Sequence, residues 1–405
     1  MRVFDRDTFA DAVADGGAKI RFQFRLDDED DAAKTGAQRV KNGKVLIGRS
    51  FLDVDLDFDR VITAIGPLEG AADFDARGCY VIPGLVDIHT HGAVGEDFSD
   101  GKPEGLQPLA DYYASRGVTS YLATTMTLKE ETLTPAMGTI RDFRRNGGAK
   151  CAGVHLEGPF LCYAKRGAQA AENLHKPDAA LFHRLNEASG GQVRLVTVAC
   201  EEEGALDFIR QVSRVCTVSL GHSTADYDTA MAAFAAGASH ATHLYNGMPS
   251  FLHRAPGIIG AAFDAGASVE LICDGLHIHP AVIRATHRLF GDRLNLISDS
   301  LRCAGMPDGD YELGGQPITV KGGKATLTGT DTLAGSSISL LDAVRNVVSF
   351  GLSLPEAVYA ASTAPALAVG LTDVGAIALG KAADLVVLDR DLALKAVFVD
   401  GRREV

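Results

Sequence analysis

Short runs of β-branched and apolar residues recur eight times along the middle of the chain. They lie at 81–92, 118–125, 151–159, 194–200, 217–223, 240–246, 269–275 and 294–300. Between most of them, apolar positions repeat with the 3.6-residue period of a helix that packs one face on a core, as at 109–117, 177–189, 226–237 and 280–290. Strand and helix alternating eight times predicts an α/β fold, a (β/α)8 TIM-type barrel.

Both ends of the chain have a different pattern, in which short strands alternate with turns. Strand-like runs begin near Lys41, where Asn42-Gly43 is typical of a hairpin turn, and the pattern returns at 380–405. We therefore expect one small β-sandwich-like domain built from both termini. The predicted boundaries are 1–79 for an N-terminal extension and the first part of this domain, 80–368 for the barrel, and 369–405 for its second part.

Two further segments stand outside this scheme. A hairpin-like stretch at 311–330 interrupts the barrel pattern before a last pair of helical segments at 339–351 and 354–363. Residues 1–38 match no pattern, and the acidic run Asp27–Asp31 within them is expected to be a solvated turn.

Composition narrows the classes of partner. The 405 residues include 39 Lys and Arg against 52 Asp and Glu, a net charge of −13, which argues against nucleic acid or an anionic membrane as the main partner. A small anionic substrate needs only a local basic pocket and is not excluded. The seven cysteines are widely spaced without a CxxC pair, the N-terminus is acidic, and no run of about 18 apolar residues occurs. These features predict a cytoplasmic protein.

Chemically reactive side chains fall at one place in each predicted strand–helix unit. His89 and His91 end the first strand, Glu157 the third, His222 the fifth, His243 the sixth and Asp299 the eighth, while Asp274 and His277 follow the seventh. In a barrel these strand ends meet at one face, where active sites are built. Imidazoles and carboxylates without a cysteine suit zinc or another borderline divalent ion.

Glu157, His222 and His243 would give three protein ligands and leave one position on the metal for water, as in catalytic sites. Asp299 is then placed to move the proton of that water. Singly, each residue could be a capping or packing residue, and His89-x-His91 alone is weak because alternate strand positions face opposite ways. The occurrence of these residues together, at the ends of different predicted strands, favours a metal site. The other histidines are expected to be structural or solvent-facing: His155, His175, His183, His240, His279 and His287.

From about Lys41 onward the chain resembles the amidohydrolase superfamily and, within it, the N-acetylglucosamine-6-phosphate deacetylase family. The matching stretches are PGLVDIHTHG, GVHLEGPFL, SLGHS, THLYNGMPSFLHRAPG, CDGLHIHP, SDSLRCAGMPDGDYELGG and TLAGSSISLLDAVRN. The resemblance implies hydrolysis of the N-acetyl group of N-acetylglucosamine 6-phosphate, with Glu157, His222 and His243 on the metal and Asp299 as general base and then acid.

The resemblance also implies a substrate pocket. It assigns Ala168, Gln169, Asn246, Gly247, Arg254 and His277 to the substrate, with Leu333, Ala334 and Gly335 as a further substrate-lining segment. Arginine suits a phosphate because its guanidinium can form two parallel hydrogen bonds. In relatives, part of the pocket comes from a neighbouring subunit, which implies a homodimer.

Two features of the resemblance affect the mechanism. Many relatives carry a histidine twelve residues after the metal-binding glutamate, where this chain has Gln169. His89 and His91 are both present, and they could hold a second metal bridged by Glu157. The number of metal ions per chain, one or two, is therefore left open. Zinc is the expected metal, with iron, manganese or cobalt as alternatives. We hypothesise that a second metal polarises the acetyl carbonyl while Gln169 only positions the substrate.

Three rival functions follow from the same residues. One rival is a different amidohydrolase, such as a cyclic-amide hydrolase or a deaminase. Cyclic-amide hydrolases of the superfamily usually carry a carboxylated lysine at the end of strand four, but here Glu201 follows that strand. A deacetylase of N-acetylgalactosamine 6-phosphate differs in the orientation of one hydroxyl group, and no residue distinguishes the two sugars. A catalytically inactive binding protein would be expected to lack one or more of the active-site residues. Here the four central residues are all present: Glu157, His222, His243 and Asp299.

Overall fold

The structure is a computed structural model in which residues 37–405 are described. The N-terminal extension, with the acidic run predicted as a solvated turn, lies outside the described residues.

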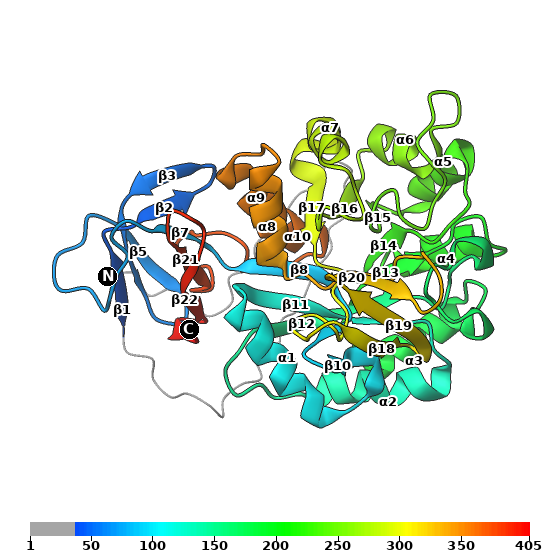
Figure 1. Ribbon diagram of the computed structural model, residues 1–405, viewed down its shortest axis with the longest axis horizontal. Coiled ribbons are helices and arrows are strands. Elements are labelled where there is room, and N and C mark those ends of the chain that lie inside the picture. Colours follow the sequence, from blue (N-terminus) through cyan, green and yellow to red (C-terminus); the bar gives the residue numbers. More distant parts are fainter. Residues whose placement is uncertain (1–36) are drawn as a thin grey trace. The chain divides into compact units, whose positions relative to one another are not determined.

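Eight parallel strands form the centre of the molecule (Figure 1). In sheet order they are β8 (Leu85–Thr90), β11 (Val118–Thr125), β12 (Lys150–Glu157), β13 (Val193–Val198), β14 (Thr217–Leu220), β15 (His240–Ala241), β16 (Ser268–Ile272) and β17 (Leu294–Ile297). Just beyond β17, Asp299 N–H donates to the carbonyl of His89 (2.9 Å), which joins the last strand to the first. The order follows the chain, so the predicted (β/α)8 barrel is confirmed.

Helices surround this barrel because each buries one apolar face on it. They are α1 (Pro103–Ser115), α2 (Glu130–Asp142), α3 (Ala179–Ala188), α4 (Ala205–Val212), α5 (Tyr227–Ala236), α6 (Gly257–Asp264), α7 (Pro280–Phe290), α8 (Leu340–Ser349), α9 (Leu354–Ala361) and α10 (Thr363–Ala368). Local sequence determines several helix starts. Ser339 with Asp342, and Ser353 with Glu356, form capping boxes that satisfy the first free N–H groups of α8 and α9.

The small β domain is built from both ends of the described chain, as predicted. A six-stranded sheet has the order β23 (Arg402–Arg403), β22 (Leu394–Val399), β21 (Leu385–Leu388), β7 (Tyr80–Pro83), β2 (Lys44–Ile47), β3 (Ser50–Asp53). A four-stranded sheet has the order β5 (Ile62–Gly66), β4 (Asp55–Phe58), β1 (Gln38–Lys41), β6 (Phe74–Asp75). The side chains of Leu56, Phe58, Val81 and Phe398 share one apolar core in this domain.

The two junctions between the domains differ from the predicted boundaries at 80 and 369. Tyr80–Pro83 pairs with β2 and β21, so the first barrel strand begins at Leu85. After α10, Val369, Leu371 and Val374 share an apolar cluster with barrel residues. The chain must return from α10 to β21, and it buries its apolar side chains against the barrel on the way. Val369, Leu371 and Val374 therefore pack with the barrel, whereas Ile377 belongs to the apolar core of the small β domain.

The predicted hairpin-like insertion is a three-stranded antiparallel sheet of β18 (Gly309–Leu313), β19 (Gln316–Lys321) and β20 (Lys324–Leu327). It lies between β17 and α8 in the chain, with its own small apolar cluster around Leu313, Ile318 and Val320. Shorter elements complete the described part: β9 (Gly92–Ala93), β10 (Glu96–Asp97) and the 3-10 turns η1 (Phe98–Asp100), η2 (Tyr163–Lys165), η3 (Ala171–Asn173) and η4 (Gly291–Arg293). Among residues 37–405, every helix is too short or too polar to cross a membrane.

Candidate metal centre and active site

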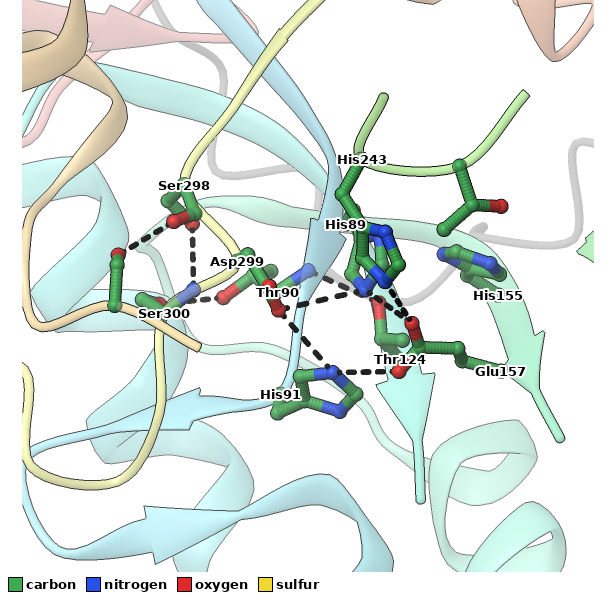
Figure 2. Close-up of polar contacts among 12 residues, drawn as sticks. His89, Thr90, His91, Thr124, His155, Glu157, His243, Ser298, Asp299 and Ser300 are labelled. Atoms are coloured by element: carbon green, nitrogen blue, oxygen red, sulfur yellow. Dashed lines mark hydrogen bonds and ion pairs between the residues drawn. The ribbon is translucent and has the colours of Figure 1, made fainter. Parts of the chain in front are cut away.

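Glu157 lies at the meeting point of the strand ends (Figure 2). Its Oε1 atom is 3.2 Å from His222 Nε2 and 3.0 Å from His243 Nε2, and these two nitrogens are 3.0 Å apart. All three side chains are buried. Residues from strands three, five and six thus present one ligand atom each to a common point, and they form one of the groups of described residues that could hold a metal ion.

A second group adjoins the first. His91 Nε2 lies 3.1 Å from Glu157 Oε2 and 3.4 Å from Asp299 Oδ1, while His89 Nε2 lies 3.4 Å from Glu157 Oε1 and 3.5 Å from Asp299 Oδ1. Both imidazoles reach the same point because β8 ends at Thr90. The chain then bends, and His91 N–H donates to the carbonyl of Ser300 (2.8 Å). Glu157 therefore lies between the two groups.

The donor set fits a divalent cation. Two imidazole nitrogens that face each other at 3.0 Å cannot both be acceptors without something positive between or on them. His89 Nε2 is fully buried and lacks a hydrogen-bond partner among the described residues. His222 Nδ1–H donates to the carbonyl of Lys165 (2.7 Å), which directs the Nε2 lone pair of the ring at Glu157. The site thus points unshared electron pairs inward.

The electrostatics favour positive charge at the same point. Burial alone would raise the pKa of Glu157, but the imidazoles of His89, His222 and His243 outweigh it and hold that pKa well below its usual range. Burial alone would lower the pKa of His91, but Asp299 and Glu157 raise it to about 9. The two carboxylates are thus stable as anions, and any cation between them is stabilised.

The backbone at the strand ends is strained. His222, His243 and Asp299 have φ angles of 48°, 25° and 46°, in the left-handed region that non-glycine residues seldom occupy. Such conformations persist only where the surroundings enforce them, and they cluster at functional sites. Here the turn after each strand directs the side chain into the barrel mouth instead of along the sheet.

A cavity of about 360 Å³ opens above Glu157, within the range of small-molecule sites. Its walls come from loops that are far apart in the sequence, including the segment after β20. Of the residues predicted to contact substrate, the cavity is lined by Ala168, Gln169, Asn246, Gly247, His277, Leu333, Ala334 and Gly335. Two of the glycines lie closely against site residues. A Cβ on Gly335 would lie 2.8 Å from the Asp299 carbonyl, and one on Gly247 would lie 3.0 Å from His222 Nδ1.

Comparison with known proteins gives the family. A model of the Amidohydrolase family matches residues 80–403. This chain belongs to the amidohydrolase family.

Three relatives cover most of the chain. N-acetylglucosamine-6-phosphate deacetylase from Vibrio furnissii is 36% identical over 90% of this chain and 93% of its own. N-acetylgalactosamine-6-phosphate deacetylase from Escherichia coli O157:H7 is 38% identical, over 85% and 92%. The D267A mutant of N-acetyl-D-glucosamine-6-phosphate deacetylase from Mycobacterium smegmatis, solved in complex with N-acetyl-D-glucosamine-6-phosphate, has a TM-score of 0.86 at 34% identity, over 91% and 99%.

Gln169 has a contact in this amidohydrolase that its sequence position did not indicate. Its amide N–H donates to Glu157 Oε2 (2.9 Å), and its amide oxygen accepts from Thr127 N–H (2.8 Å). The hypothesis that Gln169 only positions the substrate is therefore incomplete, because the side chain also holds the central carboxylate.

Arg254 is the one predicted substrate residue that lies outside the cavity wall. It is exposed and donates to His253 Nε2 (2.8 Å) in the loop before α6. His277 does line the cavity, and its Nδ1–H donates to Asp274 Oδ2 (2.7 Å). The cavity lining contains no lysine or arginine among the described residues. Within one chain of this amidohydrolase, the predicted phosphate-binding arginine is thus separate from the rest of the pocket.

Two buried carboxylates beside the site were missed in the sequence. Glu270 lies in β16 and contacts His89, and Asp87 Oδ1 accepts the backbone N–H groups of His89 and Ser298 (both 3.3 Å). A usable signal was present, since each is the single acid of its strand and lies between two apolar residues. Asp331 and Thr332 also line the cavity, and no sequence pattern marked them. Of the histidines expected to be structural or solvent-facing, His155 and His240 are fully buried inside the barrel of this amidohydrolase.

Proposed function

We propose that this amidohydrolase removes the acetyl group of N-acetylglucosamine 6-phosphate, giving glucosamine 6-phosphate and acetate, in amino-sugar catabolism. The supporting observation is the position of Glu157 at the floor of the cavity, between the two imidazole groups and beside Asp299. Curated relatives with this activity, at 34–37% identity over at least 77% of the chain, favour the same substrate.

The proposed cofactor is a divalent metal. Glu157, His222 and His243 would hold a first ion, and His89 and His91, with Glu157 and Asp299, a second. Imidazole and carboxylate donors favour zinc, with iron, manganese or cobalt as alternatives. When bound, the ion supplies a Lewis acid for the amide carbonyl and lowers the pKa of water.

Asp299 is the proposed proton carrier. Its carboxylate lines the cavity beside His91, and burial, which would raise its pKa, is outweighed by His89 and His91, which lower it. As an anion it accepts a proton from the attacking water, and it then donates that proton to the nitrogen of the leaving amine. Gln169 is not the proposed donor to the acetyl carbonyl, because its amide nitrogen already donates to Glu157.

The phosphate end of the substrate is proposed to meet Asn246, Gly247 and His277 of one chain and Arg254 of a second copy. The support is the cavity wall, to which residues 37–405 contribute no lysine or arginine, although a phosphate dianion favours a guanidinium. Arg254 is exposed in a loop whose neighbours Phe251 and Leu252 are 49% and 55% exposed. We therefore propose a homodimer, and free cysteines at all seven positions favour the cytoplasm.

The experiment is acetate release from purified protein loaded separately with zinc, iron, manganese or cobalt. N-acetylglucosamine 6-phosphate is compared with the same sugar lacking phosphate, which should be a much poorer substrate. Absence of acetate release from the phosphorylated sugar with all four ions would contradict the proposal. Arg254→Ala should raise KM far more for the phosphorylated sugar than for the unphosphorylated one.

N-acetylgalactosamine 6-phosphate is the second candidate substrate, because a curated deacetylase of that sugar is 38% identical to this chain. The same assay on both sugar phosphates decides between them by the ratio of kcat/KM. An inactive binding protein is the remaining alternative, and it predicts that no divalent ion restores activity.

A further inference from the structure

Glu270 is a carboxylate in the middle of a buried barrel strand. It is the third residue of β16, its side chain is fully buried, and its strand neighbours Val269 and Leu271 are buried as well. Placing an ionised carboxylate in such a position is costly unless several donors contact it. Its contacts therefore indicate why the residue is there.

Those contacts join the two sides of the proposed metal centre. Glu270 Oε2 accepts from His89 Nδ1–H (2.9 Å) and from the backbone N–H of His243 (3.1 Å), and Oε1 lies 3.2 Å from His240 Nε2. His89 belongs to the group with His91 and Asp299, whereas His243 belongs to the group with His222. One buried side chain thus contacts a member of each.

The contacts determine orientation. With Nδ1–H directed at Glu270, the His89 ring must present its Nε2 lone pair towards Glu157 and Asp299. The N–H of His243 is held at a residue whose φ angle is 25°, a conformation the chain does not favour by itself. The Glu270 carboxylate therefore fixes the orientation of the His89 ring and holds the strained backbone of His243 in place.

A separate metal ion bound by His89, His155 and Glu270 is a less suitable explanation, although these three residues lie close enough for one. The oxygens of Glu270 are already at hydrogen-bond distances from their donors. His155 Nε2 is engaged with Thr197 Oγ1 (2.8 Å). All three side chains are fully buried, so an ion would have no route that leaves these bonds intact.

We propose that Glu270 is a positioning residue that holds His89 and His243 in the orientation needed to bind metal, and that its geometry, more than its charge, controls metal affinity. This inference rests on the proposed metal centre. It does not depend on which sugar is the substrate.

Two substitutions separate geometry from charge. Glu270→Gln keeps the length of the side chain and an oxygen that can accept from His89 and His243, but removes the charge. Glu270→Asp keeps the charge but withdraws it by one methylene group. Metal dissociation constants are measured by chelator competition, and the visible spectrum of the cobalt-loaded protein reports ligand geometry.

We expect Glu270→Asp to weaken metal binding by about 10–100-fold, the usual effect of losing a partner behind a ligand, and to alter the cobalt spectrum. Glu270→Gln should lose less metal affinity and keep the wild-type cobalt spectrum. The matched control is Asn295→Leu, since Asn295 pairs with Glu270 in register on β17, is equally buried, and donates to the Val269 carbonyl. It should lower stability without changing metal affinity.

The inference would be overturned if Glu270→Gln bound metal as weakly as Glu270→Asp or more weakly. Unchanged metal affinity in both variants would overturn it as well. An extra ion in the wild type that both variants lose would favour the buried third site and also overturn it. Because binding is measured without substrate, wild-type protein that binds metal but releases no acetate would contradict the proposed function alone.

Discussion

Strand β12 has an ionic cluster at each end, and the charges of the two clusters are balanced differently. At its start, Lys150 Nζ lies 2.7 Å from Asp384 Oδ2 and donates to Asp400 Oδ1 (2.8 Å), while Arg145 also pairs with Asp400. Two cations there face two carboxylates. At its end, Glu157 is surrounded by imidazoles and faces Asp299, and within the described part of the chain no lysine or arginine lines the cavity.

The difference separates a structural cluster from a functional one. The first carries its own counter-charges and links the barrel to the small β domain, since Asp384 and Asp400 flank β21 and β22. The second directs lone pairs and carboxylates at a point where the described residues supply no lysine or arginine. A cluster of charged side chains therefore says little about function by itself, whereas a missing counter-charge indicates a ligand.

Metal removal should give the largest difference between the two clusters. Dialysis against a chelator should abolish acetate release, and adding a divalent ion back should restore it, because only the cluster at Glu157 needs an external cation. Circular dichroism of the metal-free protein should still show the folded barrel, because Lys150 and its partners are unaffected. Full activity after verified metal removal would contradict the comparison.

Asp299→Asn should lower kcat by about 10²–10⁴-fold, the usual contribution of a positioned acid or base. The amide keeps the size of the side chain but cannot accept the proton. At least one ion per chain should remain, held by Glu157, His222 and His243, which is checked by metal analysis. Retention of most of the rate would remove Asp299 from the proposed role.

Lys150→Met should destabilise the protein by about 3 kcal/mol, the lower end of the range for breaking a buried pair, because Lys150 is partly exposed. Asp384 would then lose its cation, and Asp400 would keep only Arg145. Urea unfolding measures the loss, and kcat/KM of the folded protein should be unchanged. The control is Lys44→Met, whose exposed pair with Asp53 should contribute below about 1 kcal/mol.

Gln169→Ala should have the smallest effect, about a tenfold loss of metal affinity with a modest fall in turnover. The substitution removes the N–H that donates to Glu157 and leaves Thr127 N–H without its acceptor. Chelator competition and steady-state kinetics on the same preparation test this. A fall in kcat above about 100-fold at unchanged metal affinity would instead make Gln169 the donor to the acetyl carbonyl.

Much of the fold was predictable because the apolar patterns are local. The run predicted at 118–125 is β11, and the helical segment at 280–290 is α7. The run at 81–92 was wrong as a single strand, because the chain changes sheets at Gly84. A Cβ at Gly84 would lie 2.1 Å from Thr119 Oγ1. The Pro83-Gly84 pair was the available signal.

The convergence of the strand-end residues was predictable from the barrel alone, since parallel strands share one carboxyl edge. Their contacts were not. The run at 240–246 pairs only over His240–Ala241, because the chain turns into a left-handed conformation at His243. The bonds from Glu157 to Gln169 and from His89 to Glu270 depend on register and loop path, which no local pattern encodes. The metal and substrate roles of these residues stay predictions.

The left-handed backbone at His222, His243 and Asp299 has an evolutionary consequence. Each such residue costs on the order of 1–3 kcal/mol relative to a relaxed conformation. This is a large share of the free energy of unfolding of an ordinary domain. Glycine or asparagine would tolerate these angles better. A descendant that lost its catalytic task would therefore be expected to drift towards those residues at these three turns first, and to gain thermal robustness as it did so.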